Sequence, residues 1–130
     1  MTGHHRREQG QAMTEFALVA PILFLLVFGI IQTGLVFGKQ LDLKSATRDG
    51  ARRGAVSMKA SDPATITRQG VLRSLALSRD TDVTVTVTPA PPWNHGDEIV
   101  VRSTTPHTYA VMGVTLWQGQ LHAEARIRVE

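Results

Sequence analysis

The feature that most constrains this chain is a stretch without a charged residue, which covers residues 16–38. Leu, Ile, Val and Phe dominate it, and as a helix its roughly 23 residues would measure about 34 Å, enough to cross a hydrocarbon core about 30 Å thick. We therefore expect a transmembrane helix over residues 11–38. Pro21 removes a backbone donor within that helix, so a bend is expected there.

A secretory signal peptide is the alternative interpretation of this stretch, with Arg6 and Arg7 as its basic start. The apolar run is too long for a signal peptide, and no Ala-x-Ala cleavage site follows it. We therefore expect the segment to be retained as an anchor. Basic residues lie on both sides of it, so charge alone does not fix its orientation.

The residues after the membrane segment predict a small α+β domain over 39–130. The long helix continues as an amphipathic stem to about Val56. Asp62 followed by Pro63 is typical of a helix start, and the second, shorter helix is expected to end near Leu77.

Alternation of valine and threonine over residues 83–88 predicts a strand with one buried side. Residues 98–103 and 121–130 predict two more strands, and the proline-rich residues 89–96 predict the loop before the second strand. We expect a three-stranded antiparallel sheet packed on the stem. Residues 109–117 are too apolar for a plain solvent loop, so they are expected to cover the core or to meet a partner.

Composition argues against several classes of function. The chain of 130 residues has no cysteine, which excludes disulfides and cysteine-ligated metal sites, and its formal net charge of +3 is too modest to indicate nucleic-acid binding. No histidine is spaced with a carboxylate as a zinc helix requires, and no phosphate loop or Gly-x-Ser-x-Gly elbow is present. We expect no enzyme activity, no cofactor, no metal and no small-molecule substrate.

One acidic residue, Glu15, stands at the start of the apolar stretch. A carboxylate at this place is either held at headgroup level or, if it is buried in lipid, needs a partner. Gly10 precedes Glu15 by five positions, and residues 10–16 lead directly into the membrane segment. This arrangement resembles a type IV prepilin processing site, in which a prepilin peptidase cuts after the glycine on the cytoplasmic side.

Cleavage after Gly10 would make residues 1–10 a cytoplasmic leader and Gln11 the new N-terminus. The formal net charge would fall from +3 to +2, because two arginines and one glutamate are lost. When such helices bundle, Glu15 can pair with the Gln11 ammonium of a neighbouring subunit in a medium of low dielectric constant.

Three segments together resemble the TadE-like family of tight-adherence (Flp) pilus assembly proteins. They are residues 15–21, the leucine-rich stretch that contains Gly29, and residues 46–55; residues 123–130 also resemble the last strand of that family. Phe16 replaces the tyrosine that follows the glutamate in the major Flp pilin, and a sheet domain follows. The resemblance therefore implies a minor pseudopilin, a single-pass protein of a bacterial cytoplasmic membrane with its C-terminal domain on the outside.

The partners implied by this resemblance are membrane lipid, a prepilin peptidase and other pilins or pseudopilins, with Glu15, Phe16 and Pro21 in the packing helix. Gly34 and Gly38 form a Gly-x-x-x-Gly pair, which lets membrane helices approach closely. The alternative is a permanently anchored extracytoplasmic binding module, in which the sheet domain and residues 109–117 capture a partner and Glu15 is incidental. We expect no nucleic-acid partner in either case.

Overall fold

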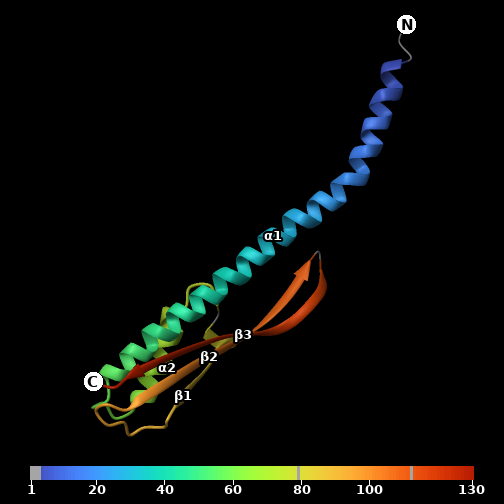
Figure 1. The fold of residues 1–130 in the computed structure, drawn as a ribbon. Helices are drawn as coiled ribbons and strands as arrows, with labels where there is room; N and C mark the ends of the chain where they lie inside the picture. The colour runs from blue at the N-terminus through green and yellow to red at the C-terminus, as the bar shows by residue number, and fades with distance from the viewer. Residues whose placement is uncertain (1–3, 79, 112) are drawn as a thin grey trace.

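The computed structural model describes residues 4–78, 80–111 and 113–130; for residues 4–9, 80 and 111 only the backbone is described. The long helix α1, His4–Val56, contains 53 residues, so the membrane segment and the stem form one continuous element. It bends in its blue N-terminal part, which includes Pro21 (Figure 1). Residues 1–3 of the expected leader lie outside the described residues.

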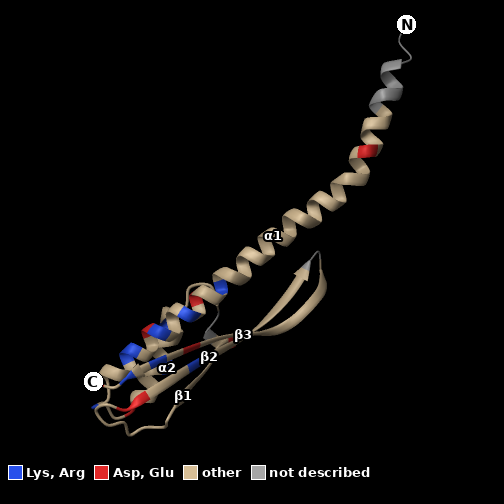
Figure 2. Cartoon of the chain, viewed as in Figure 1, with Lys and Arg blue, Asp and Glu red and all other residues tan. Residues whose placement is uncertain are grey.

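The two halves of α1 have different surroundings. In the apolar half large side chains are open to the outside, as with Ile22, which is 67% exposed, whereas Leu43 and Ala46 in the stem are fully buried. Figure 2 shows the matching division of charge, with most charged residues of α1 gathered in the stem. The stem therefore buries one stripe against the domain, while the apolar half has almost no protein cover.

The second helix, α2, Pro63–Ser74, begins as the sequence predicts. The Asp62 carboxylate accepts hydrogen bonds from the Thr65 hydroxyl and, at 3.0 Å, from the Thr65 amide, and these bonds hold the pKa of Asp62 below its usual value. The expected end near Leu77 was wrong by about one turn. The Asp42 carboxylate of α1 accepts hydrogen bonds from the amides of Ala76 and Leu77, which fixes these residues outside the helix.

The domain contains a three-stranded antiparallel sheet in the order β1-β2-β3, which confirms the predicted α+β fold. Its strands are β1, Thr84–Thr88, β2, Glu98–Val111, and β3, Val114–Arg128; the short 3-10 helix Asp80–Asp82 precedes them. One face of the sheet packs against α2 and the stem of α1. The side chains that this face buries or half-buries include Val85, Val87, Ile99, Val101, Ser103, Thr105, Leu121, Ala123, Ala125 and Ile127.

The β2–β3 hairpin is much longer than the sequence indicates. The second strand continues to Val111 and the third begins at Val114, so residues 109–111 and 113–117 form the end of a hairpin and not a connection over the core. Residues 104–108 and 118–120, which lengthen the two strands, show no alternation of apolar and polar side chains, and the pairing shifts in register after Tyr109. Gly113 supplies the positive φ, +85°, that the turn uses.

The predicted loop before β2 closes the other end of the sheet. Trp93 in this loop is only 5% exposed and packs with Ala55, Ile99 and Val129, while its Nε1 donates a hydrogen bond to the Pro89 carbonyl at 2.9 Å. The turn that the sequence predicts at residues 94–96 is present, with Gly96 at a φ of +94°.

Candidate processing and assembly site on the N-terminal helix

Gly10, the predicted processing residue, lies within α1 and is exposed. A Cβ built on it would meet nothing within 4 Å. Its carbonyl accepts a hydrogen bond from the Thr14 hydroxyl at 2.8 Å. The peptide bond after Gly10 is therefore accessible and helical in this structure.

Gln11 and Glu15 are the candidate site residues that the structure brings together. Gln11 Nε2 donates a hydrogen bond to Glu15 Oε1 at 3.1 Å, the contact expected of residues four apart on a helix. Phe16 is 66% exposed, and its side chain projects about 100° around the helix axis from that of Glu15.

The other candidates are distributed along the helix. Gly10 and Gly38 are about 42 Å apart along an ideal helix axis, so the candidate residues form a long surface and not a compact site. A Cβ on Gly34 would meet nothing within 4 Å, whereas one on Gly38 would lie 3.4 Å from Leu77 Cδ1. Gly34 is thus open to a neighbouring helix, and Gly38 is partly covered by the domain of its own chain.

A second glycine pair, Gly50 and Gly54 on α1, lies in close contact with α2. The sequence alone did not mark this pair as a contact. A Cβ on Gly50 would lie 2.8 Å from the Thr67 carbonyl, and one on Gly70 would lie 3.1 Å from Gly50 Cα. A Cβ on Gly54 would collide with the Thr67 hydroxyl. Here the backbones of α1 and α2 approach as only glycine allows.

Polar bonds also attach the stem to the sheet. The Thr47 and Ser103 hydroxyls, both fully buried, are 2.9 Å apart, and the Thr47 hydroxyl is also 2.6 Å from the Leu43 carbonyl. Gln40 Nε2 donates to the His122 carbonyl at 2.7 Å. No local pattern in the sequence reveals these pairs, because their members are far apart along the chain.

The hairpin reaches back to the apolar half of α1. The Tyr109 hydroxyl donates a hydrogen bond to the Gly29 carbonyl at 3.3 Å, and the Thr33 hydroxyl donates to the same carbonyl at 2.8 Å. Trp117 is the cross-strand partner of Tyr109, and its indole lies where a Cβ on Gly119 would be. The contact with Gly29 places the end of the hairpin beside the predicted membrane segment.

His107 lies on β2 near the end of the apolar half. Its Nε2 is buried and has no hydrogen-bond partner in the structure. Burial lowers the pKa of His107, and the positive charge of Lys39 acts in the same direction. The neutral imidazole is therefore favoured at this position.

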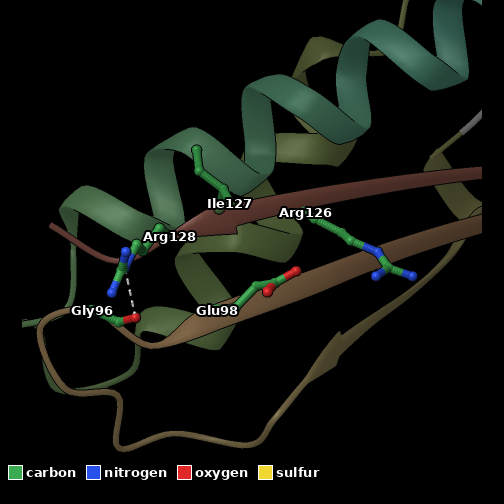
Figure 3. A pocket seen from close by; sticks show the side chains of 5 residues that line it. All are labelled: Gly96, Glu98, Arg126, Ile127 and Arg128. Atoms are coloured by element: carbon green, nitrogen blue, oxygen red, sulfur yellow. Dashed lines mark hydrogen bonds between the residues drawn. The ribbon is translucent and has the colours of Figure 1, made fainter.

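An open pocket lies at the other end of the sheet, lined by Gly96, Glu98, Arg126, Ile127 and Arg128 (Figure 3). Its guanidinium groups are already engaged. Arg128 Nε donates to the Gly96 carbonyl at 2.9 Å, and Arg126 Nε contacts Glu124 at 2.8 Å.

The surface cluster beside this pocket consists of Glu124 with Arg126 and Arg102. Hydrogen bonds from Arg126 and then from Arg102 hold the pKa of Glu124 below its usual value, and Glu124 raises the pKa of Arg126. Among the described residues no group of three or more His, Cys, Asp or Glu is placed to hold a metal ion. These charges form an exposed network and not a catalytic arrangement.

The comparisons with known proteins bear on α1. The model of the TadE-like protein family matches residues 10–52. Over this segment the chain is similar to TadE-like proteins. The match begins at Gly10, includes Glu15 and the apolar half of α1, and ends within the stem. Neither the curated proteins nor the solved structures give a match.

The family match confirms the resemblance that the sequence shows over the N-terminal helix. The sheet lies beyond the matched residues, so the likeness of residues 123–130 to the family's last strand stays a prediction. Within the described residues, Gly10–Val56 is the one helix long and apolar enough to cross a membrane. The match and this helix together fit a membrane protein associated with a Tad pilus.

Proposed function

We propose that this protein is a membrane-anchored minor pseudopilin that takes part in assembly of a tight-adherence (Flp, type IVb) pilus. The observation that carries the proposal is the TadE-like match, which begins on the predicted processing glycine and continues through the apolar helix. The apolar half of α1 leaves its large side chains exposed. Lipid and neighbouring helices of other pilins are the partners that suit this surface.

Processing by a prepilin peptidase after Gly10 is the first step of the proposed mechanism. It releases residues 1–10 on the cytoplasmic side and leaves an ammonium on Gln11. In the uncut helix the Glu15 carboxylate already accepts a hydrogen bond from the side-chain amide of Gln11. A charged ammonium from a neighbouring subunit is a stronger partner for the carboxylate than this amide, so trimming favours pairing between subunits.

Lateral packing of α1 is the second step. Gly34 follows Gly29 by five residues, so it faces about 140° away from the side of the helix that Tyr109 contacts. A neighbouring helix can approach closely at Gly34 without meeting the hairpin. The C-terminal domain stays outside the cytoplasmic membrane, and the protein acts as a structural component without a cofactor or a substrate.

Gly10→Ala tests the processing step. A methyl group here fits the helix, since nothing lies within 4 Å, so loss of trimming would report recognition by the peptidase and not misfolding. In cells that carry the matching peptidase, we expect this variant to remain untrimmed, while the wild type begins at Gln11 by N-terminal sequencing. Gly29→Ala is the matched control, because that site is equally open to a Cβ. Normal trimming of Gly10→Ala would contradict the proposal.

Glu15→Ala tests the assembly step. We expect the variant to be trimmed and inserted normally but to assemble few pili, because the carboxylate that pairs with the neighbouring ammonium is absent. Glu15→Gln keeps the size of the side chain and removes the charge, so it should share the defect. The readouts are the membrane-bound amount and the pili counted by electron microscopy. Normal pili from both variants would favour the permanently anchored binding module.

A further inference from the structure

The end of the β2–β3 hairpin is an apolar surface that the proposed assembly role does not use. Residues 108–121 contain no charged residue and no histidine. Val114, Leu116 and Trp117 are 63%, 62% and 54% exposed. An exposed apolar group of this kind marks a contact surface.

The position of this surface indicates what it contacts. Tyr109 donates its hydrogen bond to Gly29, which lies in the middle of the uncharged stretch of α1. Figure 1 shows the hairpin extending past the rest of the sheet and alongside α1 toward its N-terminal part. If α1 crosses a membrane, the end of the hairpin must therefore lie against or within that membrane.

The backbone of the hairpin limits how deep it can lie. β1 pairs with β2 only at residues 100–104, so over residues 105–121 no described strand pairs with either outer edge of the hairpin. Free strand edges are not tolerated in hydrocarbon, since their amides and carbonyls would lack partners. The hairpin end therefore requires water or lipid headgroups around its edges.

This requirement moves the expected outer boundary of the hydrocarbon core from the end of the uncharged stretch toward the N-terminus of α1. If the hydrocarbon ended at Lys39, Gly29 would lie about 15 Å deep, near the centre of a core about 30 Å thick. A span from Gln11 to Ile30 has about the same length as the core, roughly 30 Å, and ends at the level of the hairpin. The first polar pair of the stretch, Gln32 and Thr33, then lies among the headgroups.

We propose that the described residues of the hairpin end, 109–111 and 113–117, form a second membrane contact that lies in the interfacial layer of the bilayer beside α1. Tyr109 and Trp117 are cross-strand partners, and both are residue types that favour this layer, with apolar rings and one polar group. The inference rests on the proposed membrane anchorage of α1. A lipid surface is the favoured occupant, because an anchored α1 brings this uncharged surface to the bilayer before any protein partner arrives.

The absence of cysteine makes a labelling test direct. Val114→Cys places a single thiol at the exposed hairpin end, and Thr84→Cys places one on exposed β1 as the matched control. The full chain is reconstituted in vesicles of phosphatidylethanolamine and phosphatidylglycerol and treated with a membrane-impermeant maleimide. We expect Val114→Cys to react about tenfold more slowly than Thr84→Cys, because interfacial apolar groups lie about 5–10 Å within the boundary layer.

Tryptophan quenching shows whether lipid itself provides the protection. In vesicles whose acyl chains carry bromine near the headgroup, we expect quenching of the wild-type fluorescence and none in Trp117→Phe. The remaining Trp93 is 5% exposed within the domain core, so it serves as an internal control.

The outcomes separate this inference from the proposed function. Equal labelling of the two thiols, in protein that resists extraction by alkaline carbonate, would overturn the hairpin contact and leave the anchorage intact. Release of the protein by carbonate would overturn both. Protection of Val114→Cys only in cells that assemble pili, with none in vesicles, would replace the lipid with a protein partner and overturn the inference.

Discussion

Two glycine pairs on α1 have the same spacing and different surroundings. Gly50 and Gly54 in the stem face α2 so closely that a Cβ on either would collide with it. Gly34 in the apolar half faces open space, and Gly38 meets only the end of the Leu77 side chain. Two glycines four residues apart therefore pack against another helix in the stem, whereas the glycine pair with the same spacing in the apolar half has no helix packed against it.

The difference between the pairs lies in what stands opposite them. The stem pair meets Gly70 and Thr67 of α2, which are small or β-branched and belong to the same chain. No small-residue helix of this chain stands opposite Gly34 and Gly38 in the described structure. Glycine spacing thus indicates that a helix permits close approach, but the neighbour must be found independently.

Gly50→Ala should give the largest effect on this comparison. The added Cβ would lie 2.7 Å from the Val71 amide nitrogen and 2.8 Å from the Thr67 carbonyl, which are backbone atoms, so α2 must move. Because backbone atoms obstruct the Cβ, we take the cost of overpacking at the upper end of its usual range, about 3 kcal/mol; alanine returns up to about 1 kcal/mol of helix propensity, so we expect a net loss of about 2 kcal/mol. Denaturant unfolding in detergent, followed by Trp93 fluorescence in a Trp117→Phe background, measures it.

Gly34→Ala is the control for that measurement. Its Cβ meets nothing within 4 Å, so the unfolding midpoint of the domain should not fall. If both substitutions destabilise the domain equally, the contrast between the two pairs is wrong. If neither does, α1 and α2 are not as close as the structure has them.

Two threonines on α1 offer a second matched pair of variants. Thr47 and Thr33 each contact the carbonyl four residues earlier, at 2.6 and 2.8 Å. Thr47 is fully buried and also bonds to Ser103, whereas Thr33 is exposed. Thr47→Ala leaves the buried Ser103 hydroxyl without its partner, so it should lower the free energy of unfolding by roughly 1–3 kcal/mol.

The same fluorescence measurement provides the control for the threonine pair. Thr33→Ala should leave the unfolding of the domain unchanged. Thr47→Ala combined with Ser103→Ala should cost less than the sum of the two single changes, because neither hydroxyl is then left without its partner. Additive losses would show that the two hydroxyls do not act together.

The sequence predicts those parts of the fold that depend on local patterns. The uncharged stretch predicts the apolar half of α1, Asp62 and Pro63 predict the start of α2, and the valine alternation predicts β1. Each signal lies within a few residues or one continuous segment. For this reason the order of elements and the fold class could be predicted.

The parts that depend on distant partners could not be predicted. Gly50 in an amphipathic stem is only a weak helix position until α2 brings Gly70 against it. The long hairpin was missed because residues 104–108 and 118–120 show no alternation of apolar and polar side chains, so their strand pairing is not visible in the sequence. Of the candidate site, the motif around Gly10 and Glu15 could be proposed from the sequence because it is local, while the contact between Tyr109 and Gly29 joins residues 80 apart.

The smallest expected effect concerns the junction between the two halves of α1, where His107 lies near Lys39. Burial and the lysine charge lower the pKa of His107 from its ordinary value of 6.5, so the folded state resists protonation more than the unfolded chain does. The stability that depends on neutral His107 is therefore complete above about pH 6.5 and is lost as the pH falls toward the lowered folded-state pKa. His107→Gln should reduce the fall in the unfolding midpoint between about pH 8 and about pH 5. The carboxylates of Asp62 and Glu124, whose pKa values are also lowered, titrate below this range and are the same in both proteins. An equal fall in the wild type and the variant would therefore show that His107 does not couple the junction to pH.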